Sequence, residues 1–263
     1  MRNIKLTIEY DGTRYNGWQR QRSLKCKVES VKLKRKVKNP TLRTIQEEIE
    51  KAIEIITGKR STLYGSGRTD SGVHAKAQVA NFHTDCTLPT DKLQKALNAV
   101  LPKDISVIKT EKTHRAFHSR YSAKSKTYCY AILNRRVRSP FLSRYSLHIP
   151  HKLNFSLMRK EASVLLGRHN FKSFQAASRK GRPSVRKIKK IILSKDKNSV
   201  IKIIIEADGF LYNMARNIAG TLIETGKGKL PPGSMKKILN AKDRNMAGET
   251  APARGLCLIE VKY

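Results

Sequence analysis

Apolar and polar residues alternate at the beginning of the chain, which is the pattern of a β-strand with one buried face. The apolar positions of this first strand are Ile4, Leu6, Ile8 and Tyr10, and an Asp-Gly turn follows them. Further stretches with strand character occur at residues 78–83, 105–109, 126–133, 188–193 and 200–207. The pattern therefore predicts β-strands along the whole chain.

Apolar residues recur at helical spacing between these strands. The clearest case begins at Thr44, which forms a capping box with Glu47, and stops at Gly58. Its predicted buried face consists of Ile45, Ile49, Ala52, Ile53 and Ile56. Similar spacing predicts helices at residues 91–101, 155–166 and 211–225, before a final helix and strand. The mixture of strands and helices is typical of an α/β (α+β) protein.

The chain has 263 residues, which is enough for two domains that each bury a core. A predicted strand ends shortly before Lys112, and a basic, aromatic segment follows it. We therefore expect an N-terminal α/β domain at residues 1–112 and a C-terminal α/β domain at residues 113–263.

The charge of the chain narrows the choice of partner. Lys and Arg number 55 against 20 Asp and Glu, which gives a formal net charge of +35. Such an excess of positive charge favours binding to a polyanion, and nucleic acid is the first candidate for this partner. A membrane surface is the alternative, but the chain has no apolar run of about 18 residues, and its basic residues do not line a single amphipathic helix.

The sequence gives no sign of secretion or of a metal site. The N-terminus lacks the apolar core of a signal peptide, which predicts a cytoplasmic protein. The widely spaced cysteines predict reduced, structural thiols; they are Cys26, Cys86, Cys129 and Cys257. His114 and His118 are four residues apart, but no acidic residue lies between them, and we expect no metal there.

Residues 65–82 contain the strongest candidate for chemistry. Gly65, Gly67 and Gly72 bracket the other two residues of interest, Arg68 and Asp70. Glycines permit positive φ and close approach to a ligand. An ionised Asp suits a nucleophile when a cation such as Arg68 lies nearby. A plain turn, in which Asp70 caps its own backbone, explains the local chemistry as well.

Residues 67–75, Gly-Arg-Thr-Asp-Ser-Gly-Val-His-Ala, resemble the signature of the TruA family of tRNA pseudouridine synthases. A second resemblance covers residues 9–21 and includes Gly-Trp-Gln-Arg-Gln, in which Trp18 is otherwise a core anchor. Further runs that are similar to family motifs lie at residues 210–220 and 251–258. The matches keep their order along nearly the whole chain.

The resemblance implies roles for five residues. Asp70 matches the catalytic nucleophile, and Tyr128 matches an active-site tyrosine that stacks on the target base and is implicated in proton transfer. Arg216 matches the arginine that pairs with this Asp, which agrees with the need of a buried Arg for a carboxylate. Arg68 would take the space or the phosphate vacated by the flipped nucleotide. Leu256 would line the active site, although a plain core residue is the alternative for it.

The chain departs from the family pattern in several places. A basic insertion occupies residues 23–41, and both phosphate contacts and the absence of any role are open for it. The basic loop at residues 179–187 favours contact with tRNA phosphates over plain solvated charge. Ala77 and Asn81 stand where the family more often has Gly and His, near the expected nucleophile.

The resemblance implies a tRNA pseudouridine synthase that isomerises uridine at positions 38, 39 and 40 of the tRNA anticodon stem-loop. The implied fold has two α/β domains, each a mostly antiparallel sheet flanked by helices, which form a basic RNA-binding cleft. No cofactor or metal is expected, and the expected partners are tRNA and a second copy of the chain in a homodimer. The alternatives are a noncatalytic RNA-binding protein of the same fold and a pseudouridine synthase for another RNA.

Overall fold

The structure is a computed structural model that describes residues 1–20, 43–176 and 183–263. The insertion at residues 23–41, Cys26 and residues 179–182 of the basic loop lie outside the described residues. The longer strands are β1 (Arg2–Tyr10), β3 (His74–Thr84), β4 (Ile105–Thr113), β5 (Ser125–Leu133), β7 (Gly167–Asn170), β8 (Val185–Lys195), β9 (Val200–Ala207) and β10 (Leu256–Lys262). Two strands are short, β2 (Tyr64–Gly65) and β6 (Leu147–His148). The α-helices are α1 (Ile45–Thr57), α2 (Thr90–Val100), α3 (Phe155–Ser163), α4 (Met214–Gly226) and α5 (Ser234–Ala241).

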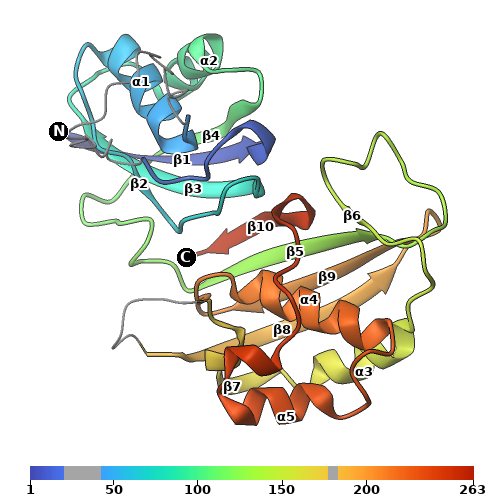
Figure 1. The fold of residues 1–263 in the computed structure, drawn as a ribbon. Helices are drawn as coiled ribbons and strands as arrows, with labels where there is room; N and C mark the ends of the chain where they lie inside the picture. The colour runs from blue at the N-terminus through green and yellow to red at the C-terminus, as the bar shows by residue number, and fades with distance from the viewer. Residues whose placement is uncertain (21–42, 177–182) are drawn as a thin grey trace, which may run out of the picture.

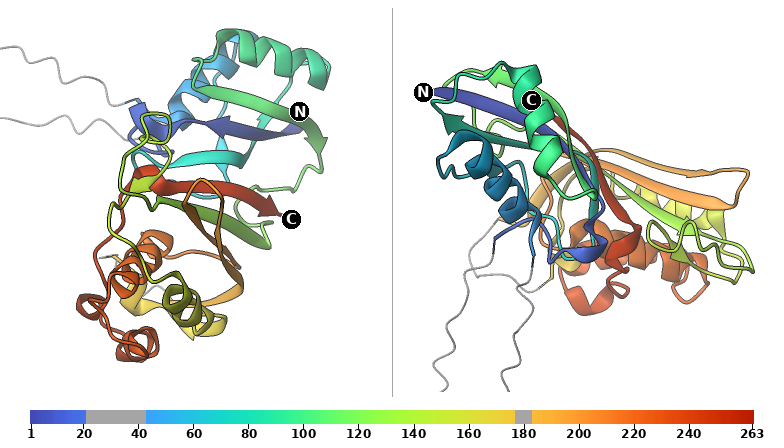
Figure 2. Two further views of the ribbon diagram at one scale, coloured as in Figure 1. Left: turned by 90° about the vertical axis from the view of Figure 1, so that its right-hand side faces the viewer. Right: turned by 90° about the horizontal axis from the view of Figure 1, so that it is seen from above.

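The described strands form one mixed, mostly antiparallel sheet in the order β4-β1-β3-β10-β5-β9-β8-β7, with β2 beside β3 and β6 beside β5. The last strand of the chain returns to the middle of this sheet, between β3 and β5 (Figure 2). Its contact with β3 is parallel and short, with Cys257 opposite His74. Strands from the beginning and the end of the chain are therefore neighbours at the centre of the sheet.

The helices gather at the two ends of the sheet. Figure 1 shows α1 and α2 together near β1 and β4, and α3, α4 and α5 together near β8 and β7. Apolar side chains fill the layers between helices and sheet. The largest of those that are almost completely buried include Trp18, Phe82, Tyr130, Phe171 and Phe174.

The expected α/β class and the individual elements are confirmed, with small shifts at their ends. α1 begins after Thr44, whose side chain accepts a hydrogen bond from the Glu47 N–H, and ends at Gly58 with φ of 69°. α4 begins later than expected, because Asn213 adopts φ of 60° and cannot belong to a right-handed helix. The domain boundary near Lys112 stays a prediction; β4 ends one residue later.

None of the helices in the described part of the chain is both long and apolar enough to cross a bilayer.

Candidate active site

The candidate active site is built on the loop between β2 and β3, residues 66–73, which we call the Asp70 loop. The Ser66 N–H donates to the Val79 carbonyl (2.7 Å), and the Val73 N–H donates to the Asp70 carbonyl (3.2 Å). Gly72 has φ of 77°, so the loop uses a glycine in the left-handed region there, as expected. The backbone therefore fixes the loop at both ends of the turn that presents Asp70.

The two other glycines act through their small size, which corrects the expectation that they take positive φ. Neither Gly65 nor Gly67 has a φ in that region. A Cβ on Gly65 would lie 2.5 Å from Nε1 of Trp18, whose ring is buried against this strand. Gly17 precedes Trp18 in the Gly-Trp-Gln-Arg-Gln run at residues 17–21, which we call the Trp18 motif. Gly17 has φ of 82°, and a Cβ on it would lie 2.4 Å from the Thr69 carbonyl oxygen. The Trp18 motif thus packs directly against the Asp70 loop.

An ion pair joins the Asp70 loop to the second half of the chain. Nη1 of Arg216, near the beginning of α4, donates to Oδ2 of Asp70 at 3.0 Å. Nε of Arg216 donates to the Ala251 carbonyl at 2.8 Å, and Nη1 also reaches the Asn213 side chain at 3.3 Å. The Arg216 side chain is 17% exposed and that of Asp70 is 26% exposed. The arginine is held in place, while the carboxylate remains open to a ligand.

Tyr128 on β5 lies in the core beside this pair. It is 8% exposed, and its ring meets Phe210 edge-on with the ring centroids 4.8 Å apart. Burial raises the pKa of the Tyr128 hydroxyl far above its usual value, and the negative charge of Asp70 adds to this. The hydroxyl therefore stays protonated at neutral pH and can donate a hydrogen bond.

Leu256 and Arg68 have different environments. Leu256 is the first residue of β10, is 6% exposed and lies opposite Tyr130 on β5. Arg68 is exposed, and its Nε donates to Oε1 of Gln19 at 3.0 Å. The Gln19 amide donates in turn to Oε1 of Gln46 in α1 at 2.9 Å. The cation that pairs with Asp70 is thus Arg216, whereas the Arg68 side chain is oriented by its hydrogen bond to Gln19 of the Trp18 motif.

Lys126 is a further residue at the loop that the sequence analysis did not single out. Its Nζ donates to the Ser66 carbonyl and lies against Gly67, where a Cβ would be 2.9 Å from Nζ. Among the described residues, no carboxylate forms a salt bridge with it. Burial, with a smaller contribution from Arg120, lowers the pKa of Lys126 to about 8. Lys126 shares its strand face with Tyr128, so strand periodicity could have revealed it.

We expect a Lys126→Met variant to gain stability over the parent at neutral pH and to lose most of that gain at high pH. The pKa of Lys126 is about 8 in the folded chain and 10.5 in the reference state. Between these pH values the unfolded chain therefore binds more protons than the folded chain does. The cost of burying the charged Lys126 lowers the stability of the parent fully below pH 8, and this loss disappears above pH 10.5. The difference in unfolding free energy should shrink by about 2 kcal/mol between pH 7 and 10 in urea titrations. An unchanged difference would contradict this assignment.

The departures from the family pattern at Ala77 and Asn81 lie on β3, beyond the Asp70 loop. Asn81 is fully buried and donates to the side chain of Asn3 at 3.0 Å. It also accepts from the Ser119 N–H at 2.8 Å. Asn81 therefore anchors the segment between β4 and β5. The structure shows no reason for Ala77.

The histidine pair in that segment serves local turns. Nδ1 of His114 accepts from the Ala116 N–H, and Nδ1 of His118 accepts from the Arg120 N–H. The described ranges contain no group of three or more His, Cys, Asp or Glu side chains placed to hold a metal ion.

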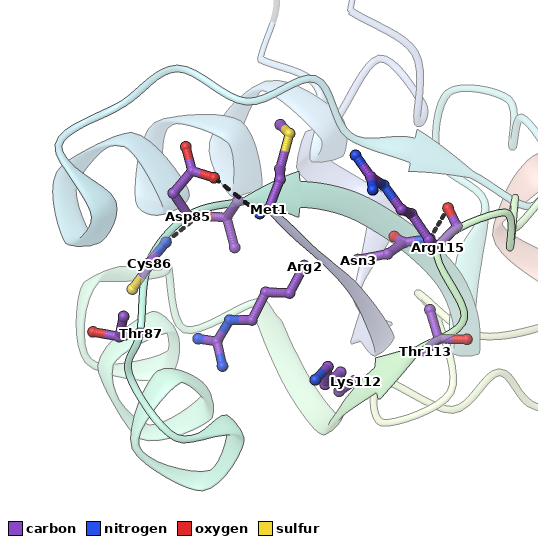
Figure 3. A pocket seen from close by; sticks show the side chains of 10 residues that line it. Met1, Arg2, Asn3, Asp85, Cys86, Thr87, Lys112, Thr113 and Arg115 are labelled. Atoms are coloured by element: carbon purple, nitrogen blue, oxygen red, sulfur yellow. Dashed lines mark hydrogen bonds and ion pairs between the residues drawn. The ribbon is translucent and has the colours of Figure 1, made fainter.

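A cavity of about 560 Å³ lies apart from the Asp70 loop, at the beginning of β1 (Figure 3). The Arg2 side chain points into it, and Lys112 and Arg115 also line it. The other end of β1 carries Tyr10, whose hydroxyl bonds to that of Thr69 in the Asp70 loop at 2.8 Å. The cavity is thus at the far end of the strand from Asp70.

Comparison with known proteins identifies the family of this chain. A family model described as tRNA pseudouridine synthase matches residues 6–122 and 162–263. The chain belongs to the tRNA pseudouridine synthase family. Three relatives named tRNA pseudouridine synthase A are similar to this chain. The protein from Clostridium acetobutylicum is 44% identical to it, that from Acetivibrio thermocellus 43% and that from Clostridium botulinum 45%. Each match spans 263 residues, 100% of this chain and 100% of the relative. The predicted family and the isomerase class are confirmed.

Proposed function

We propose that this protein converts uridine to pseudouridine in tRNA, at positions 38, 39 and 40 of the anticodon stem-loop, with Asp70 as the nucleophile. The observation that carries the proposal is the Asp70–Arg216 ion pair, at 3.0 Å, near the buried side chain of Tyr128. Family membership supports tRNA as the substrate, because the relatives are named tRNA pseudouridine synthase A.

The reaction is an isomerisation, so its atoms balance without a co-substrate. The bond between ribose C1′ and uracil N1 breaks, the base turns, a bond forms between C1′ and C5, and the C5 proton is lost as N1 gains one. The Asp70 carboxylate adds either to C1′ or to the uracil ring and leaves again when the new bond forms. The guanidinium of Arg216 orients the carboxylate for this attack, since two of its nitrogens are fixed by Asp70 and Ala251.

Three further residues complete the proposed site. Tyr128 supports the flipped base and supplies a protonated hydroxyl beside it, in agreement with its raised pKa. Leu256 covers the base from β10. Arg68, exposed on the Asp70 loop, takes the space or the phosphate that the flipped nucleotide leaves. Flipping costs a few kcal/mol, which the phosphate contacts of a chain with a net charge of +35 offset.

The proposed setting is a basic cleft between two domains of a cytoplasmic homodimer. Within each chain, the short parallel contact between β3 and β10 brings the Asp70 loop next to the strand that begins with Leu256.

Mapping of pseudouridine in single-uridine tRNAs tests the proposed positions. Three tRNA transcripts that each carry one uridine at position 38, 39 or 40, and a fourth with none of them, are incubated with the protein. We expect pseudouridine in the first three only. Product in the fourth would show another RNA target site, and tRNA binding without product in any transcript would favour a noncatalytic RNA-binding protein.

A further inference from the structure

Three aromatic rings, tilted against one another by 46° and 39°, form a row with one guanidinium beside the Asp70 loop. The rings of Tyr64 and His118 have centroids 5.0 Å apart, and those of His118 and Tyr121 are 4.4 Å apart. The Arg120 guanidinium lies 5.7 Å from the centroid of the Tyr121 ring. We call these four residues the aromatic ladder. Tyr121 is 77% exposed and Tyr64 is 40% exposed, so the outer ring faces solvent.

The ladder is attached to the loop that carries the proposed nucleophile. The Ser119 hydroxyl donates to the carbonyl of Tyr64, which ties the turn at residues 118–122 to β2. The His118 ring is fixed as well, because its Nδ1 accepts from the Arg120 N–H at 3.1 Å. Tyr64 precedes Asp70 by six residues, which limits their separation to about 20 Å along an extended chain. That reach corresponds to a few nucleotides.

The outer ring of the ladder adds little to the stability of the fold. A ring that is 77% exposed contributes little to the core, yet Tyr121 is the outermost member of a row of contacting rings. Its surroundings are cationic, with Arg120 over its face and Lys126 near Arg120 and bonded to Ser66 of the Asp70 loop. Exposed aromatic rings next to cations are the arrangement that binds unpaired nucleotides, since bases stack on the rings and phosphates pair with the cations.

We propose that the aromatic ladder is a subsite for an unpaired base of the RNA substrate, which stacks on Tyr121 while a neighbouring phosphate pairs with Arg120. The proposal rests on the proposed function, because it places this base within a few nucleotides of the uridine at Asp70. The ladder contributes to binding, and no member of it takes part in the bond changes. It therefore gives the site a contact with RNA next to the reacting nucleotide.

The test compares Tyr121→Leu, Tyr121→Phe and Phe141→Leu with the parent protein. Phe141 is 88% exposed on the segment between β5 and β6, so Phe141→Leu makes a matched change outside the ladder. Three quantities are measured with one anticodon stem-loop RNA: KM and kcat for pseudouridine formation, and Kd for binding.

We expect Tyr121→Leu to raise KM and Kd about 5- to 100-fold, as loss of one base–aromatic stack would. We expect kcat to change little, and Tyr121→Phe and Phe141→Leu to behave as the parent does. Unchanged KM and Kd in Tyr121→Leu would overturn the proposal, as would an equal effect of Phe141→Leu. A parent protein that binds the RNA but forms no pseudouridine would contradict the proposed function, and Kd would still decide on the ladder.

Discussion

An Asp70→Asn variant is expected to bind tRNA with the affinity of the parent and to form no detectable pseudouridine. Asn has the shape of Asp, and its side-chain oxygen can still accept the hydrogen bond from Nη1 of Arg216. It lacks the negative charge and the nucleophilic oxygen that the proposed reaction needs. The loop should therefore keep its conformation while the chemistry stops. The measurements are filter binding with tRNA and analysis of nucleosides after digestion.

Asp70→Ala is the matched control for this variant, since an Asn can hydrolyse slowly to Asp and produce a trace of activity. Asp70→Asn should melt near the parent temperature, whereas Asp70→Ala leaves the largely buried Arg216 without its carboxylate and should melt lower, so tRNA binding is compared at a temperature where both variants are folded. Pseudouridine formation at the parent rate in Asp70→Ala would exclude Asp70 as the nucleophile.

Removal of the Arg216 guanidinium is expected to lower the rate of the chemical step by about 100-fold or more, the usual effect of a misplaced reacting group. In Arg216→Met, Asp70 loses its ion-pair partner and the Ala251 carbonyl loses its donor. Arg216→Lys keeps the positive charge but cannot bridge both oxygens as the planar guanidinium does, so we expect an intermediate rate. Single-turnover rates with saturating tRNA separate this effect from weaker binding.

The Arg216 variants need a control for loss of the fold, because the Arg216 side chain is only 17% exposed and lies near the beginning of α4. Melting temperatures are measured for both variants, and the comparison uses only variants that are folded at the assay temperature. A folded Arg216→Met protein with the parent rate would contradict the role of the ion pair.

Local sequence signals predicted those elements that local contacts determine. The capping box of Thr44 and Glu47 and the stop at Gly58 fixed the bounds of α1 within one residue, because these residues satisfy the free ends of the helix themselves. The alternation at residues 4–10 identified β1 because one face of that strand is buried in the core, although the strands that pair with it lie far away in the sequence.

Local sequence signals do not predict features that depend on contacts between residues far apart in the chain. The single sheet depends on the pairing of β10 with β3, and no local pattern states which strand a terminal strand joins. The direction of Arg68 depends on Gln19, which is 49 positions away in the chain. In contrast, the Asp70–Arg216 pair was accessible from sequence, because a buried arginine requires a carboxylate and the family resemblance named which one.

The most direct test of the central claim is release of tritium from C5 of uracil when the purified protein is incubated with unmodified tRNA. We predict that the parent protein releases tritium and that Asp70→Ala releases none while it still binds the tRNA. Absence of release by the parent, with tRNA bound, would contradict the account, and so would equal release by the two proteins.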